Sequence, residues 1–311
     1  MTTQIQNIIN STNTKTEKIR LLLELGISRQ EIARLITNNN VGFVYNVYKK
    51  YFLNSAAAQS INFIPTSFNR RFGIEIEAYN VNMNQLKNSL KAAGIEIEVE
   101  GYNHTTRPYW KIVTDSSIQG QQSFEVVSPI LEGEDGINQI DIVCQVLEQT
   151  GAKVNKSCGL HIHFDAAGFN LDTWKRIYKN YAKIENTIDG FMPDSRRADT
   201  NRFCKGFKSI SNFSNKINEA SNLSDISRIF SNNRYFKINP TSYVRHNTCE
   251  FRQHAGTMDF RKITRWIKFL HNFVEFSTSF EIQDSTLNGL AKFNQSAIVE
   301  FYKHRTNKLA S

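Results

Sequence analysis

Two histidines alternate in the segment CGLHIHFDA, residues 158–166. In a β-strand His161 and His163 would share one face, about 6–7 Å apart, while Leu160 and Ile162 would point to the other face. A neutral imidazole binds metal ions, and a protonated one contacts anions such as phosphate. The spacing alone leaves a structural role for the pair as open as a functional one.

The segment TCEFRQHAG, residues 248–256, shows the same alternation with three different polar groups. As a strand it is expected to place Glu250, Arg252 and His254 on one face. A carboxylate suits a divalent cation, and a guanidinium suits a phosphate. A surface ladder of cross-strand ion pairs would look the same at this level, so both interpretations stay open.

The pentapeptide GIEIE occurs twice, with Glu75 and Glu77 in the first copy and Glu96 and Glu98 in the second. Both copies predict strands with isoleucines on one face and carboxylates on the other. The second copy continues into EVEGY and adds Glu100, which is typical of a solvated strand face. Periodicity alone does not separate the two copies, but this third glutamate favours a solvated face for the second one.

A further glutamate, Glu125, lies in SFEVVSPIL, residues 123–131. If Glu75, Glu77, Glu125 and Glu250 shared one face of a sheet, their carboxylates would repel one another unless cations lay between them.

The elements that would position these residues begin at about residue 68. Strands are expected over seven segments: 71–80, 94–102, 110–118, 123–131, 158–166, 235–244 and 248–256. Helices are expected over 81–93, 136–150, 171–191 and 260–280, and the polar segment 217–233 is read as loop with at most one short helix. This mixture predicts an α+β domain with a largely antiparallel sheet and helices packed on one side.

The N-terminal part has a different pattern. Residues 15–52 predict three helices, with Ser28 as N-cap and Glu31 completing a capping box, in the layout of a helix-turn-helix. This segment has seven Lys or Arg and three Glu, an excess of positive charge that suits contact with phosphates. Its third helix, however, is rich in aromatic and apolar residues, which suit packing against a protein. Binding of DNA or RNA and docking to a protein partner both stay open.

The expected organisation is a trihelical unit over 1–55, a linker over 56–67 and one larger domain over 68–311.

Composition narrows the class of protein. The hydrophobic content of 40% is enough for a packed core, and the formal charge of +9 favours an anionic partner such as a nucleotide or nucleic acid. No apolar run reaches the roughly 20 residues of a membrane span, and the N-terminus does not resemble a secretory signal. The four cysteines have no metal-binding spacing and suit reduced thiols, so a cytoplasmic location is expected. The chain has no G-x-x-x-x-G-K-[ST] loop, which argues against a P-loop ATPase.

The ordered motifs carry a family resemblance. They are FGIEIE, W-x-x-x-x-D-x-S-I, FEVVSP, CGLHIHFD, P-x-S-R-R followed by NRFC, and EFRQHAGT. Between about residues 70 and 280 the chain resembles the amidoligase family, a branch of the glutamine synthetase and glutamate–cysteine ligase superfamily of carboxylate–amine ligases. The resemblance implies a glutamine synthetase-like sheet, ATP as co-substrate, and Mg²⁺ or Mn²⁺.

The resemblance also implies roles for individual residues. Metal ligands would be Glu75, Glu77, Glu125, His161 and Glu250. Contacts to ATP would come from His163, Arg252 and Lys237, substrate or nucleotide contacts from Arg196, Arg197 and Asn201, and the catalytic set would be Glu75, Glu77 and Arg252. Among these, the carry-over to Lys237 and to the Arg196–Asn201 segment rests on the fewest matching residues.

The function implied is an ATP-dependent ligase that joins a carboxylate to an amine through an acyl phosphate. No counterpart of an ammonia site is found, so the amine is expected to be larger, such as an amino acid, a peptide or a protein side chain. The alternative is a nucleic-acid-binding regulatory or structural protein that uses the helix-turn-helix unit, with the larger domain as scaffold.

Overall fold

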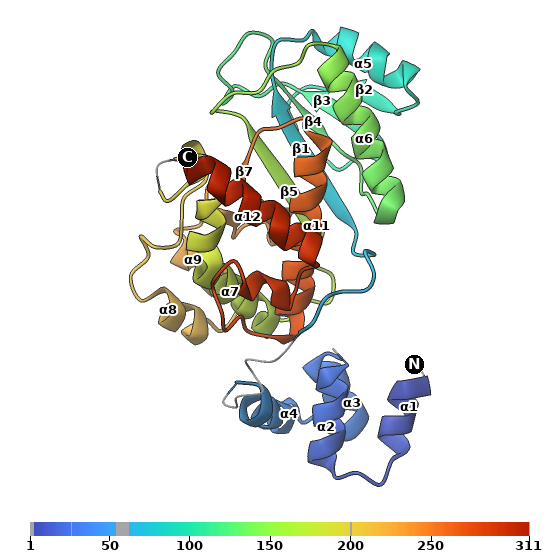
Figure 1. Ribbon diagram of the computed structural model, residues 1–311, viewed down its shortest axis with the longest axis vertical. Coiled ribbons are helices and arrows are strands. Elements are labelled where there is room, and N and C mark those ends of the chain that lie inside the picture. The colour runs from blue at the N-terminus through green and yellow to red at the C-terminus, as the bar shows by residue number, and fades with distance from the viewer. Residues whose placement is uncertain (1–2, 26, 54–61, 200, 311) are drawn as a thin grey trace.

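The computed structural model describes residues 3–25, 27–53, 62–199 and 201–310. Its larger part is built on a seven-stranded sheet with the order β2-β3-β4-β1-β5-β7-β6 (Figure 1). The strands are β1 (Phe72–Ala78), β2 (Ile97–Val99), β3 (Trp110–Val113), β4 (Phe124–Val127), β5 (Gly159–Asp165), β6 (Ile238–Asn239) and β7 (Thr248–Ala255). All neighbouring strands run antiparallel except β2 and β3. The predicted α+β class with a largely antiparallel sheet is confirmed.

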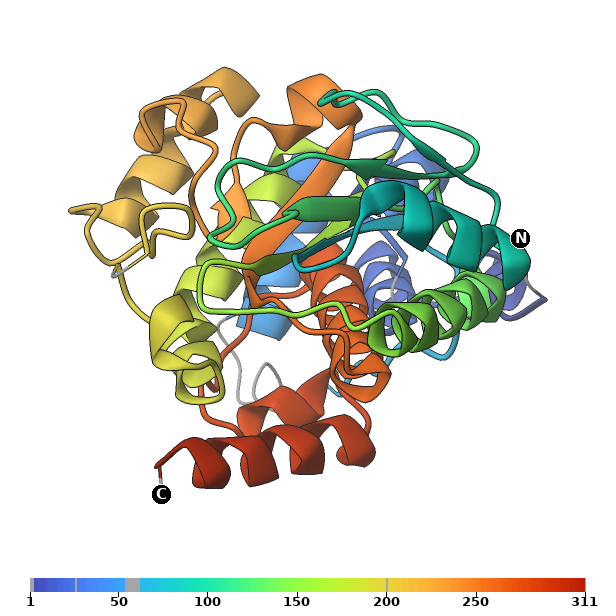
Figure 2. The same cartoon turned by 90° about the horizontal axis from the view of Figure 1, so that it is seen from above.

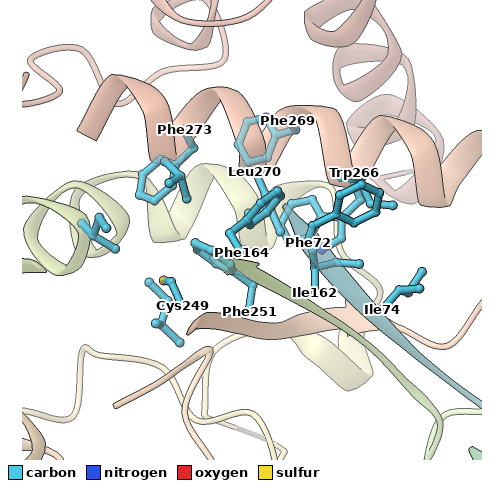
Figure 3. Packing of buried hydrophobic residues seen from close by; sticks show 14 of the residues in the cluster. Phe72, Ile74, Ile162, Phe164, Cys249, Phe251, Trp266, Phe269, Leu270 and Phe273 are labelled. Atoms are coloured by element: carbon cyan, nitrogen blue, oxygen red, sulfur yellow. The ribbon is translucent and has the colours of Figure 1, made fainter. Parts of the chain in front are cut away.

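The apolar face of the sheet forms the core. Ile74 on β1, Phe164 on β5 and Phe251 on β7 are buried because alternation sends them to the same side. They pack against α11 (Phe260–Ser279), whose Phe273 ring lies 6.0 Å from that of Phe251 (Figure 3). The opposite face of the same strands is thereby left for polar side chains.

The remaining long helices complete the layers. Helices α6 and α7 pack against α11, α5 packs against α6, and the C-terminal α12 lies along the outside of α11 (Figure 2). Their bounds are α5 (Met83–Ala92), α6 (Gly133–Gln149), α7 (Leu171–Gly190) and α12 (Ser296–Ala310). Helices α5, α6, α7 and α11 lie close to the ranges predicted from sequence, whereas α12 was not predicted. No helix of the described ranges is both long and apolar enough to span a bilayer.

Two segments differ from the prediction. The strand expected over 235–244 is wrong in its second half, because only β6 (Ile238–Asn239) pairs and Pro240, which has no N–H to donate, is followed by α10 (Ser242–His246). The segment 217–233, predicted as loop with at most one short helix, contains α9 (Leu223–Ile229) and the end of a second helix, α8 (Phe213–Glu219). Both helices bury apolar side chains that the polar composition of this segment concealed.

The N-terminal unit contains α1 (Thr3–Asn10), α2 (Lys15–Glu24), α3 (Arg29–Ile36) and α4 (Val41–Tyr48), followed by a π-helical turn (Lys49–Leu53). The predicted cap is present, since Ser28 Oγ accepts a hydrogen bond of 3.2 Å from Glu31 N. The unit lies beyond one end of α7 in Figure 1.

The two parts of the chain are in contact. Arg29 of α3 is buried, lies over the rings of Tyr45 and Tyr48, and forms an ion pair of 3.2 Å with Asp172 at the start of α7. The predicted linker over 56–67 falls partly outside the described residues, which resume at 62. In the described portion the Phe63 ring lies 5.6 Å from that of Phe280, so this portion packs on the larger domain.

Candidate active site

Six ionisable side chains meet across the polar face of the sheet. They form three cross-strand pairs: Glu77 with Glu125, Glu75 with His161, and His163 with Glu250. Alternation along β1 and β5 accounts for the shared face, and antiparallel pairing aligns the residues across strands. The structure thus brings together all five residues predicted as metal ligands, with His163 beside them.

Glu75 lies between the two histidines. Its Oε2 is 2.8 Å from His161 Nδ1, and its Oε1 is 3.2 Å from His163 Nε2. Thr248 Oγ1 lies 3.0 Å from His163 Nδ1 and orients that ring. Burial raises the pKa of Glu75, but the charge of His163 and hydrogen bonds to both histidines outweigh it and hold the pKa well below its usual range. An ionised carboxylate therefore occupies the middle of the face.

Glu77 and Glu125 lie on the neighbouring part of the face. Glu77 Oε2 accepts a hydrogen bond of 2.6 Å from Gly159 N, and Glu77 Oε1 lies 3.5 Å from His161 Nε2. Burial, followed by the charges of Glu75 and Glu77, raises the pKa of Glu125 well above its usual range. A cation between these carboxylates would reverse that repulsion, which is the electrostatic reason for considering a metal here.

The ligand atoms fall into two groups that share His161. One group is Glu75, His161 and Glu250, the other is Glu77, Glu125 and His161, and within each the atoms lie within 4.8 Å of one another. Several carboxylate oxygens with one imidazole fit Mg²⁺ or Mn²⁺ better than a soft metal.

Glu250 connects the carboxylates to a guanidinium. Its Oε1 accepts a hydrogen bond of 2.5 Å from Arg252, and its Oε2 accepts one of 2.7 Å from Asn239 Nδ2 on β6. Burial raises the pKa of Glu250, but the charges of Arg252 and His163 lower it to about 2. The pair places a fixed positive charge next to the predicted metal ligands.

His254 does not lie on this face, contrary to the alternation expected along β7. A β-bulge shifts the register, so that Leu160 pairs with His254 while Ile162 pairs with Phe251. The extra residue sends His254 to the apolar side, where its ring lies 5.5 Å from that of Trp266. Burial there lowers the pKa of His254 to about 3, so the ring is neutral.

A cavity of about 800 Å³ opens over the polar face. Besides the carboxylates and histidines it is lined by five arginines: Arg196, Arg202, Arg234, Arg245 and Arg252. Sequence reasoning missed Arg202, Arg234 and Arg245. A repeated arginine–aromatic dipeptide, RF at 202–203 and RY at 234–235, is the signal that could have found two of them.

Of the predicted substrate residues, only Arg196 lines this cavity. It is buried, and its Nη2 donates a hydrogen bond of 2.5 Å to Cys158 O just before β5. Arg197 Nε instead donates to Met192 O at 2.6 Å, and Asn201 Nδ2 donates to Ser195 O at 3.0 Å. Neither belongs to the cavity lining, so their substrate role stays a prediction that the geometry does not favour.

Lys237 also lies away from the cavity. Its side chain is 0% exposed, and its Nζ lies 2.7 Å from Glu185 and 2.6 Å from Asp189, both on α7. Asp189 also accepts a hydrogen bond of 2.6 Å from Gln253 Nε2, next to Arg252 on β7. The predicted ATP contact by Lys237 stays untested, and the geometry gives this lysine a different environment.

The second GIEIE copy takes no part in the site. Glu96 is exposed, and Glu98 forms ion pairs with Lys91 and Lys87. Glu100 pairs with Arg107 at 2.8 Å, which lowers the pKa of Glu100 to about 2. These carboxylates thus differ from Glu75 and Glu77 in being neutralised by lysine or arginine or left in solvent.

The fold and the site define an α+β protein in which strand carboxylates and histidines face an arginine-lined cavity. A family model described as "Putative amidoligase enzyme" matches residues 68–274, which is more than half of the chain, and the protein belongs to that family. The match begins where the larger domain was expected to begin.

Among the solved structures that match is one described as a novel glutamine synthase homolog, with 11% sequence identity and a TM-score of 0.41, over 79% of this chain and 67% of that one. No curated protein matches the sequence.

Proposed function

We propose that the protein is an ATP-dependent ligase that forms an amide or isopeptide bond between a carboxylate and an amine. The observation that carries the proposal is the convergence of the glutamates of β1, β4 and β7 with His161 beside an arginine-lined cavity. The family supports a ligase in general, and the site residues support this form of the reaction.

In the first step an oxygen of the substrate carboxylate attacks the γ-phosphorus of ATP, and the bond to the β-phosphate oxygen breaks to release ADP. The residues that would hold divalent ions are Glu75 and Glu250 on one side and Glu77 and Glu125 on the other, with His161 between them. Such ions would neutralise phosphate charge and keep the reacting oxygens in line. Arg252, fixed by Glu250, would stabilise charge on the transferred phosphoryl group.

In the second step the amine nitrogen attacks the acyl carbon, the bond from that carbon to the phosphate oxygen breaks, and the nitrogen loses a proton as inorganic phosphate leaves. A second cavity of about 230 Å³ is lined in part by Glu75, Glu125 and His163, the same side chains that border the larger one. We propose that the amine arrives through this smaller cavity. Its size suits a narrow alkylamine chain better than a nucleotide.

The nucleic-acid alternative has weaker support. Of the cations on the N-terminal helices, Arg20 pairs with Glu17, Arg34 pairs with Glu31, and Arg29 is buried against α7. These guanidiniums are already neutralised, which reduces their value as phosphate contacts. A salt-dependent mobility shift that disappears when residues 1–55 are removed would favour the alternative.

The test compares the two GIEIE copies. The full chain is titrated by calorimetry with the β,γ-imido analogue of ATP in the presence of Mn²⁺, and ADP release from ATP is followed separately. Glu75→Ala and Glu77→Ala should weaken metal-dependent nucleotide binding or turnover by more than about 100-fold, because several kcal/mol of charge stabilisation is lost.

The matched controls are Glu96→Ala and Glu98→Ala, which alter the same pentapeptide outside the site. They should leave binding and turnover nearly intact. Equal losses from both pairs, or no binding by the unaltered chain, would contradict the proposed function.

A further inference from the structure

Two arginine–aromatic pairs line one wall of the large cavity. The Arg202 guanidinium lies 4.5 Å from the Phe203 ring centroid, and that of Arg234 lies 5.2 Å from the Tyr235 centroid. The two rings meet edge to face with centroids 5.2 Å apart. Residues far apart in sequence therefore form one continuous surface of aromatic faces and guanidiniums.

Among the residues that the structure describes, no carboxylate lies within ion-pair distance of Arg202 or Arg234 of this wall, or of Arg245 in the same cavity. Arg234 Nε is in addition buried without a hydrogen-bond partner. A buried donor without a partner is costly, so the wall is suited to receive an anionic ligand with acceptor atoms.

The wall continues directly from the predicted phosphate contact. Arg252 Nε donates to Phe203 O at 3.5 Å, and the Arg252 guanidinium lies 5.7 Å from the Tyr235 ring centroid. An extended ligand with its terminal phosphate near Arg252 would thus have its remaining length along Phe203 and Tyr235. The cavity volume of about 800 Å³ accommodates such a ligand.

We propose that Phe203 and Tyr235 form the surface on which the base of the bound nucleotide stacks, with Arg234 contacting its phosphates. The inference rests on the proposed function, and it gives the nucleotide a direction along the cavity. The base lies at the wall between the 201–207 segment and β6, and the reacting phosphate lies at the strand carboxylates. A planar heteroaromatic base suits this wall because stacking on aromatic side chains needs no particular hydrogen-bond pattern.

The competing occupant is the acid substrate, whose carboxylate could use the same arginines. The two are separated by comparing a ligand with a base and one without. The full chain with Mn²⁺ is titrated by calorimetry with the β,γ-imido analogue of ATP and, separately, with inorganic tripolyphosphate. The variants are Phe203→Leu and Tyr235→Leu, which remove the aromatic face but keep an apolar side chain, and Arg234→Ala.

Loss of base stacking should weaken the ATP analogue by roughly 5- to 150-fold in each leucine variant, while tripolyphosphate binding changes less than about twofold. Arg234→Ala should weaken both ligands to a similar extent, because it removes a phosphate contact. The control is Phe43→Leu, a half-exposed aromatic on α4 in the N-terminal unit, which should change neither. Circular dichroism checks that each variant folds, and Arg202→Ala, at an exposed residue of the wall, replaces any leucine variant that does not.

Each result decides a different point. If the leucine variants bind the ATP analogue as the unaltered chain does, or lose affinity for it and for tripolyphosphate equally, the base does not stack on this wall and the inference is overturned while the ligase proposal stands. If the unaltered chain binds neither ligand, the proposed function fails and the inference fails with it.

Discussion

Replacing Lys237 with methionine separates the role predicted from sequence from the one that the structure indicates. The family resemblance implies that Lys237 contacts ATP, but its side chain is fully buried between Glu185 and Asp189. Methionine keeps the length and removes the charge, so two carboxylates lose their cation in a buried position. Breaking a buried ion pair costs about 3–5 kcal/mol. At about 2–4 °C per kcal/mol for a domain of this size, the expected fall in melting temperature is roughly 6–20 °C.

The assays are thermal and urea unfolding followed by circular dichroism, together with nucleotide titration of the folded protein. Lys262→Met is the control, because Lys262 pairs with Asp259 at the surface and its loss should change the free energy of unfolding by less than about 0.5 kcal/mol. The double variant Lys237→Met with Asp189→Asn should recover part of the loss, since it removes one uncompensated charge. A Lys237→Met protein of near-normal stability that no longer binds nucleotide would refute the structural reading and favour the direct ATP contact.

Two further perturbations test the packing around the site. Burial lowers the pKa of His254 to about 3 from an ordinary value of 6.5, so between these pH values the unfolded chain binds a proton that the native chain does not. The free energy of unfolding should therefore fall by about 1.4 kcal/mol per pH unit as pH drops from 6.5 towards 3. His254→Gln should flatten that part of the pH profile, measured by urea unfolding. Gly206→Ala should destabilise by about 1–3 kcal/mol, because a Cβ there would lie 2.4 Å from Glu185 Oε1; an unchanged urea midpoint would show that Glu185 can move aside without loss.

The polar face of the sheet could be predicted from sequence because it depends on local alternation. In β1 and β5 the period of two residues places Glu75 with Glu77 and His161 with His163, and antiparallel pairing then brings the strands into register. The order of motifs along the chain supplied the rest, including Glu125 on β4. What alternation cannot foresee is a bulge, and for that reason the prediction for His254 on β7 was wrong.

The basic side of the cavity could not be predicted in the same way. Arg202, Arg234 and Arg245 lie in irregular segments or a short helix, where no periodicity relates residue number to direction. The surroundings of Lys237 could not be predicted either, because this residue directly precedes β6 and its side chain is fully buried. Its partners Glu185 and Asp189 lie more than 45 residues earlier on α7, a relation that only the tertiary fold reveals.

The cavity therefore joins two kinds of surface with different rigidity. The carboxylates and histidines lie on β1, β4, β5 and β7, each of which pairs with a strand on both sides, so the sheet fixes the backbone from which they extend. Of the five arginines, only Arg252 lies on a strand, where Glu250 holds it, and the other four lie in loops or short helical segments. Contacts from loops can adjust to the outline of a ligand. For the proposed reaction, substitutions that alter which substrate is accepted are therefore expected in the segments 196–207 and 234–246. The carboxylates and histidines of the strands, which would carry out the reaction, are expected to stay unchanged.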